Sequence, residues 1–149
     1  MTQRVLILHH VEPDWEAPLV SRGTSFEEVC EDIIDHIENS EQYDRIILTR
    51  WEDWRLCDEH YHTGIAHYVT QVENYCYGWE AESAEQDTDT VWAEGGTHSE
   101  VVPLYNWILG LQDSEVFLAG AFDGECIEDM EYALKGANVN FTRLNHLII

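Results

Sequence analysis

Three short runs of consecutive apolar residues constrain the fold of this chain more than any other feature of its sequence. They span residues 5–8, 46–48 and 116–119, and none of them alternates with polar residues. A strand that is buried on both faces is apolar at successive positions, because helices cover both sides of a parallel sheet. The runs therefore predict a parallel sheet at the centre of the molecule.

A helix is predicted between the first two runs, over residues 25–39. Ser25 followed three residues later by Glu28 forms a capping box, which marks the start of a helix. Apolar residues then recur at helical spacing, at Phe26, Val29, Cys30, Ile33, Ile34 and Ile37. Strand, helix and strand in this order predict a βαβ unit, whose crossover is right-handed in nearly all proteins.

The rest of the chain repeats this alternation, with one segment that the sequence leaves open. Residues 63–77 fit either a helix or a strand, within a stretch rich in Trp, Tyr and His. We expect a strand over 90–93, a helical face over 101–111, a strand over 116–119, a helix over 126–134 and a last strand over 139–144. We therefore predict a single domain, residues 1–149, with a Rossmann-like, three-layer α/β fold and helices on both faces of a mostly parallel sheet.

The chain is strongly acidic. Asp and Glu total 30 against 7 Lys and Arg, so the formal net charge is −23, and Lys135 is the only lysine. Such a surface repels phosphate backbones and anionic membranes, and no segment has the roughly 18 apolar residues of a membrane span. We expect neither nucleic acid nor a membrane as a partner.

Three explanations of this acidity stay open. Adaptation to high salt is the first, since at about 1 M salt the Debye length is roughly 3 Å and carboxylates repel one another little. A surface that imitates DNA toward a basic protein is the second. Ordinary surface acidity is the third.

The cysteines and the start of the sequence favour a cytoplasmic protein. Cys30, Cys57, Cys76 and Cys126 form no CxxC pair. No signal-peptide pattern precedes the first predicted strand. We expect a reducing environment.

Ligands of parallel α/β sheets bind at the carboxyl ends of the strands. The residues that follow the predicted strands are His9 and His10, then 49–51, then Glu94, and finally 120–126. Cys126 falls in the first turn of its helix, with Asp123 as the expected N-cap, where the helix dipole favours a thiolate. Neighbouring carboxylates at 125, 128 and 129 favour the neutral thiol instead, and a small buried residue on the helix stripe is the alternative interpretation of Cys126.

The order of these pieces resembles that of the isochorismatase-like cysteine hydrolases, the superfamily that includes the nicotinamidases. Residues 116–134, with Cys126 six residues after Gly120, are similar to the family's strand, turn and nucleophile helix. Residues 91–96 with 104–111 are similar to its lysine-bearing strand and the next helix, and 49–51 with His60 and His62 to the loop after its second strand. The resemblance implies a cysteine that attacks a small amide or ester while backbone amides hold the oxyanion.

Two of the family's three catalytic positions differ in this chain. The family's aspartate closes the first strand, where His9 and His10 stand, and Glu94 stands in place of its lysine. We predict Cys126 as the nucleophile, His9 as the base and Glu94 as the group that orients the base. We expect Trp51, Trp54 and Phe122 to bind a small-molecule substrate, and we expect no cofactor.

The alternative function is a non-catalytic derivative of the fold that acts as an acidic structural or protein-binding component. With either function, self-association of the chain or an interface with a protein partner would use the aromatic residues between 51 and 79. If the chain is non-catalytic, we expect side chains to close off Cys126.

Metal-type ligands are densest at Cys57, His60, His62 and His67. Four such ligands could form a tetrahedral zinc site if their loop folds back, although their spacing fits no defined zinc finger. We assign no metal site on this basis and leave the group as an open alternative.

Salt adaptation makes a prediction about stability. The free energy of unfolding should rise as NaCl is raised to molar concentration, because salt screens the repulsion among carboxylates. Urea unfolding followed by circular dichroism at increasing NaCl measures this. Equal stability at low and molar salt would contradict the explanation.

Overall fold

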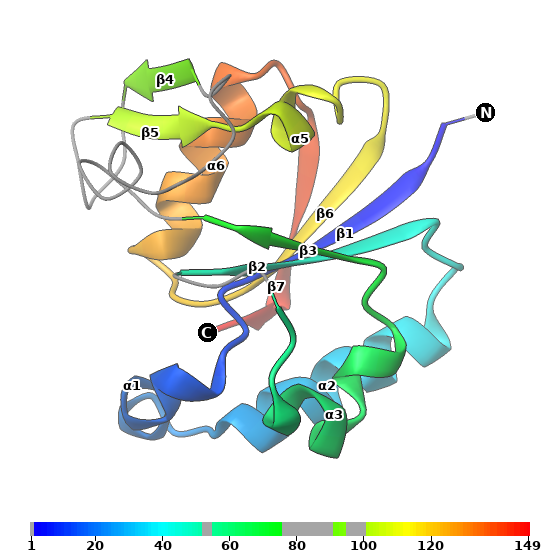
Figure 1. Ribbon diagram of the computed structural model, residues 1–149, viewed down its shortest axis with the longest axis vertical. Coiled ribbons are helices and arrows are strands. Elements are labelled where there is room, and N and C mark those ends of the chain that lie inside the picture. The colour runs from blue at the N-terminus through cyan, green and yellow to red at the C-terminus, as the bar shows by residue number, and fades with distance from the viewer. Residues whose placement is uncertain (1, 52–54, 76–90, 95–100) are drawn as a thin grey trace.

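Five parallel strands form the central sheet, in the order β3-β2-β1-β6-β7 (Figure 1). The computed structural model describes residues 2–51, 55–75, 91–94 and 101–149. The strands are β1 (Arg4–His9), β2 (Arg45–Arg50), β3 (Gln71–Asn74), β6 (Glu115–Gly120) and β7 (Phe141–Ile148). The predicted parallel sheet is confirmed.

Helices cover both faces of this sheet (Figure 1). One face carries α1 (Glu16–Ser21), α2 (Phe26–Asn39) and α3 (Asp58–Thr63), with the short 3-10 helices η1 (Pro13–Trp15) and η2 (Ile65–His67). The other face carries α5 (Asn106–Leu109) and α6 (Cys126–Gly136). The predicted three-layer α/β class is therefore confirmed.

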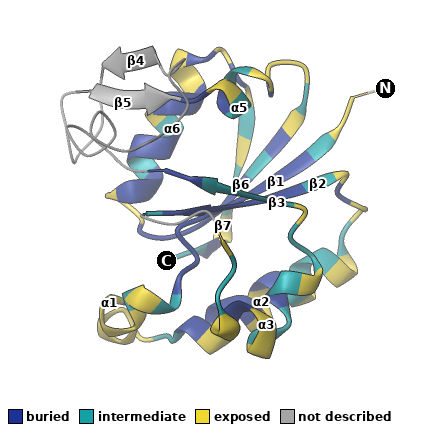
Figure 2. Ribbon diagram, viewed as in Figure 1, coloured by how far each residue is buried: buried dark blue, intermediate teal, exposed yellow. Residues whose placement is uncertain are grey.

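Strand β1 shows why the apolar runs are continuous. Val5 and Ile7 belong to the core cluster on the α6 side, whereas Leu6 and Leu8 belong to the cluster on the α2 side. All four are fully buried, as the blue central strands of Figure 2 show. Because successive side chains point to opposite faces, both sets must be apolar, and each contributes about 1.5–3 kcal/mol on burial.

Helix α2 begins where the sequence predicts. Ser25 is its N-cap, and the Ser25 hydroxyl oxygen accepts a hydrogen bond from the Glu28 N–H at 3.1 Å. The Glu28 carboxylate accepts from the Thr24 hydroxyl at 3.2 Å. The buried face consists of Phe26, Val29, Cys30 and Ile33.

Residues 101–104 form a strand, so the predicted helical face over 101–111 is wrong in its first part. Strand β5 (Val101–Leu104) pairs antiparallel with β4 (Val91–Glu94) in a separate two-stranded sheet beside α6. The adjacent β-branched residues Val101 and Val102 favour an extended backbone, and a two-stranded ribbon tolerates Pro103. A helix begins only at Asn106.

The bounds of the last helix and strand also differ from expectation. Helix α6 ends at Gly136 and not at 134, and β7 spans Phe141–Ile148 in place of the predicted 139–144. Glu125, and not Asp123, is the N-cap of α6, so Cys126 is its first residue. Gly136 is the last residue of the helix, and Asn138 takes the left-handed conformation after it. Residues 63–77, which the sequence left open, contain η2 and β3.

Gly120 ends β6 directly opposite His9 of β1. Its φ is +122°, a region that side chains disfavour, and a Cβ atom there would overlap the His9 main-chain carbonyl oxygen. The close approach of these two strands therefore requires glycine at this position.

Replacing Gly120 with alanine should destabilise the fold strongly. We expect a loss of at least about 3 kcal/mol, because backbone and not a flexible side chain blocks the added methyl group. Gly23→Ala is the matched control, since Gly23 also has a positive φ but nothing within 4 Å of an added Cβ. That control should cost only about 1 kcal/mol. Similar losses of unfolding free energy in urea would contradict the proposed overlap.

Candidate active site at the carboxyl edge

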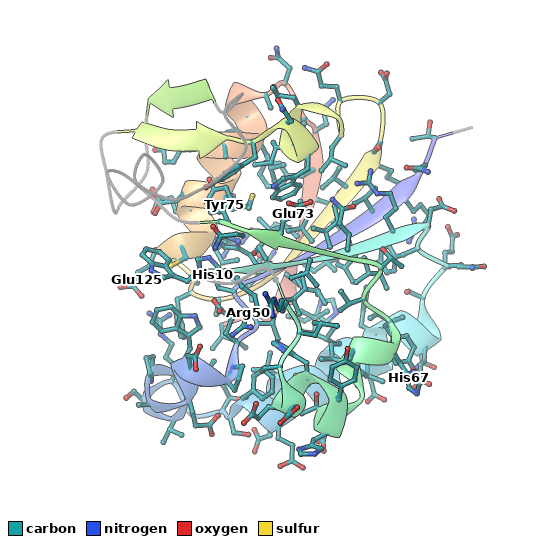
Figure 3. All side chains as sticks on the ribbon, viewed as in Figure 1. His10, Arg50, His67, Glu73, Tyr75 and Glu125 are labelled. Atoms are coloured by element: carbon teal, nitrogen blue, oxygen red, sulfur yellow. The ribbon has the colours of Figure 1, made fainter. Side chains whose placement is uncertain are left out.

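Buried polar side chains gather where the parallel strands end. His9 and Thr49 are fully buried at the ends of β1 and β2, and Asn74 is buried at the end of β3. Figure 3 shows His10 and Tyr75 close together at this edge, with Glu125 at the same side of the molecule and His67 far from it. The carboxyl edge therefore holds most of the buried polar side chains that the structure describes.

Two neighbouring side chains fix the ring of His9. Its Nδ1 lies 2.7 Å from the Thr49 hydroxyl oxygen, and its ring meets the Tyr75 ring edge to face at 5.3 Å. His9 follows Val5 and Ile7 in the strand alternation, so its side chain lies on the α6 side of the sheet. Since Thr49 occupies Nδ1, proton exchange with a substrate or thiol would use Nε2.

His10 lies against His9 and has a left-handed backbone with φ of 54°. The two imidazole rings stack at 3.9 Å. Its Nε2 lies 3.1 Å from the Tyr75 main-chain carbonyl oxygen. Because a carbonyl oxygen only accepts, this bond places a proton on Nε2 of His10.

Three aromatic side chains form a wall beside His10. The Trp51 and Trp15 rings lie 5.7 and 6.5 Å from the His10 ring, and Trp15 contacts both Trp51 and Phe122 edge to face at 6.3 Å. The structure thus brings two of the predicted substrate-binding residues, Trp51 and Phe122, to one place. Trp54 lies outside the described residues. Sequence analysis missed Trp15, although it stands in the loop that follows β1.

A buried carboxylate holds this wall in place. Glu12 is only 2% exposed, and its Oε1 accepts from Nε of Arg50 at 3.2 Å. Its Oε2 accepts from the Trp15 indole N–H and from the Trp51 main-chain N–H, each at 3.0 Å. Burial raises the pKa of Glu12, and these three donors act against that shift. Glu12 therefore ties the loop after β1 to the end of β2.

Sequence analysis did not single out Glu12. Its signal is position, because it stands two residues beyond His10 in a loop that leaves the carboxyl edge. Its partner Arg50 is among the residues that follow the second predicted strand. The pairing itself depends on the path of the loop, which the sequence does not specify.

Cys126 begins α6 at the same edge and on the same face of the sheet as His9. It belongs to the α6-side core cluster, together with Tyr75, and it is 7% exposed. The preceding turn crosses the edge of the sheet, since Ala121 and Phe122 pack in the α2-side cluster. Glu94 is the last residue of β4, outside the main sheet, and its side chain lies outside the part of the chain that the structure describes.

A thiol and an imidazole lie in contact at the start of α3. Nδ1 of His60 accepts the Cys57 main-chain N–H at 3.0 Å and lies 3.1 Å from the Cys57 sulfur. Nε2 of His60 lies 2.8 Å from the Val11 carbonyl oxygen. Burial raises the pKa of the Cys57 thiol and lowers that of His60, so both groups are neutral near pH 7. The pair caps the helix and anchors it to the loop after β1.

The open zinc alternative gains no support from this arrangement. Both ring nitrogens of His60 already have hydrogen-bond partners, whereas His62 and His67 are exposed. Within the described ranges, no three His, Cys, Asp or Glu side chains are grouped to hold a metal ion. What the sequence shows as a group of ligands is, at Cys57 and His60, a helix cap.

Comparison of the chain with protein-family models, with curated proteins and with solved structures finds no match. None of the described helices is long and apolar enough to cross a membrane. The fold and the edge described above therefore define the class: a three-layer α/β protein with an all-parallel central sheet and a polar, aromatic carboxyl edge.

Acidification should destabilise the fold through His60. Burial holds its pKa in the folded protein below the usual 6.5, while the unfolded chain takes up the proton near 6.5. Stability that is present above pH 6.5 is therefore lost as the pH falls below it. Unfolding in urea between about pH 5 and 8 should show a steeper loss for the wild type than for His60→Gln. The exposed His62 provides the control, because His62→Gln should keep the wild-type pH dependence.

Proposed function

We propose that the chain is a cysteine-dependent hydrolase of a small amide or ester, of the isochorismatase-like kind, with Cys126 as its nucleophile and His9 as its base. One observation carries the proposal: Cys126 starts a helix at the carboxyl edge of the sheet, on the face that also carries the His9 ring. This is the edge at which parallel α/β proteins bind their ligands.

The proposed reaction assigns a role to each group. In the proposed reaction neutral His9 carries its proton on Nδ1, 2.7 Å from the Thr49 hydroxyl oxygen, so Nε2 takes the thiol proton as the Cys126 sulfur attacks the carbonyl carbon. The imidazolium then returns this proton to the leaving amine or alcohol, and a thioester remains. Water hydrolyses the thioester, with His9 again acting as the base. The Cys126 main-chain N–H is the proposed donor to the oxyanion. The Glu125 and Ile127 N–H groups donate to the Phe122 carbonyl oxygen.

The substrate would meet an aromatic and strongly acidic protein. Trp51 and Phe122, with Trp15 between them, supply apolar ring surface at the edge. The net charge of −23 disfavours an anionic substrate at low ionic strength. We therefore propose a neutral or cationic amide or ester. Because the Thr49 hydroxyl lies at Nδ1 of His9, Thr49 and not Glu94 is the orienting group in this proposal.

The burial of Cys126 favours a second candidate. Cys126 is 7% exposed, which is also typical of a cysteine packed in a core. Such burial is expected for a non-catalytic, protein-binding derivative of the fold. In that role the acidic surface would bind a basic protein. The two candidates differ in whether the Cys126 thiol performs chemistry.

Hydrolysis of small chromogenic amides and esters, measured in molar NaCl, tests the proposal. Cys126→Ala should abolish hydrolysis, and His9→Asn should lower kcat by roughly 100-fold or more, because the base is lost. Cys57→Ala is the matched cysteine control and should retain activity, since its thiol caps a helix. Hydrolysis that survives in Cys126→Ala would contradict Cys126 as the nucleophile, and absence of hydrolysis by the wild type across the panel would favour the non-catalytic candidate.

A further inference from the structure

Two of the six arginines of this chain bind one short turn, residues 121–125, which leads into Cys126. Arg22 reaches the turn from the end of α1, and Arg143 reaches it from β7. The chain has only 7 lysines and arginines against 30 carboxylates. Two arginine contacts at one turn therefore indicate that the position of this turn is important.

Arg22 contacts most of the turn with a single side chain. Its guanidinium carbon lies 4.7 Å from the centroid of the Phe122 ring, and its Nη2 donates to the Glu125 carboxylate at 2.9 Å. Its Nη1 lies 3.5 Å from the Asp123 carbonyl oxygen and 3.4 Å from that of Ile149. Arg143 instead joins Asp123 to Glu131 of α6, so the two arginines tie the turn to different elements.

The main chain fixes the two ends of the turn. Ala121 N–H donates to the His9 carbonyl oxygen at 3.0 Å, which holds the first end against β1. The Phe122 carbonyl oxygen accepts from Glu125 and Ile127, which holds the second end against α6. Between these ends, the exposed residues Asp123 and Glu125 meet the arginine side chains.

We propose that Arg22 is a positioning residue for Cys126: it holds the turn against α1, and thereby keeps the thiol shielded and aligned on the His9 side of the sheet. The catalytic consequence rests on the proposed function, whereas the shielding of the thiol does not. We expect part of these Arg22 contacts to persist at high salt. Salt screens the half-exposed pair with Glu125, while the contact with the Phe122 ring and the carbonyl oxygens is short-range.

The experiment measures how fast iodoacetamide alkylates each cysteine of the folded protein, by mass spectrometry of its peptides. In Arg22→Gln, alkylation of Cys126 should rise roughly fivefold, because a partly exposed ion pair and a cation–π contact are lost together. Arg22→Lys should recover part of the protection, since it keeps the charge but loses the planar stacking.

Two references make the effect specific. Cys30 is fully buried on the inner face of α2, and burial raises its pKa to about 12, so it reacts only when the α2 side of the fold opens. Arg4→Gln is the matched arginine control. Like Arg22, Arg4 combines ion pairing with aromatic contact: it pairs with two carboxylates and lies over the rings of Tyr43 and Phe117, but at the amino end of β1. It should leave Cys126 alkylation unchanged.

Wild-type alkylation of Cys126 in Arg22→Gln would overturn the proposal. A parallel rise at Cys30 would also overturn it, because it would show general destabilisation. If Arg22→Gln does not fold, Arg22→Lys carries the test, because it keeps the charge but loses the planar stacking. Alkylation of Cys126 at the wild-type rate in this variant counts against Arg22. Failure of the hydrolase proposal shows separately, as absence of hydrolysis by the wild type.

Discussion

Burial of β1, β2 and β6 on both faces is the constraint on which the rest of the structure depends. A strand of this kind has no solvent-facing side on which to place polar side chains, so polarity begins where the strand ends. His9, Thr49 and Gly120 occupy one row of the strand register, and each is the first departure from an apolar run. The polar edge of the sheet is therefore a direct result of the strand lengths.

The Glu12 and Arg50 pair shows how this edge accommodates charge. Removing either ion alone from water costs several kcal/mol, which a single salt bridge offsets only when other donors and acceptors complete the set. Here the Trp15 indole N–H and the Trp51 main-chain N–H are the further donors to the Glu12 carboxylate. The Arg50 guanidinium donates in addition to the Arg55 carbonyl oxygen, 2.6 Å from Nη1, and to Asp14. The pair thus joins the loop after β1 to the end of β2.

Much of the fold was predictable, because its strongest signals are local. Continuous apolar runs identify β1, β2 and β6, and Ser25 marks the start of α2. The prediction for 101–104 failed for the opposite reason. The apolar spacing of this segment also fits a helix, and only its pairing with β4, which is distant in sequence, favours a strand.

The site was predictable only in part. Parallel topology alone brings His9 and Cys126 to one edge, whereas the contact of Trp15 with Glu12 depends on how a loop turns back. Likewise, the spacing of Cys57 and His60 does not reveal that a main-chain N–H occupies the imidazole nitrogen.

The central sheet also separates the thiols of Cys30 and Cys126. Cys30 packs in the α2-side cluster and Cys126 in the α6-side cluster, with β1 and β2 between them. A disulfide needs Cα atoms within about 7 Å, so these two sulfurs cannot join while the sheet is intact. Each thiol instead reports on its own layer. The protein therefore carries two built-in probes, which allow the opening of one half of the molecule to be followed separately from that of the other.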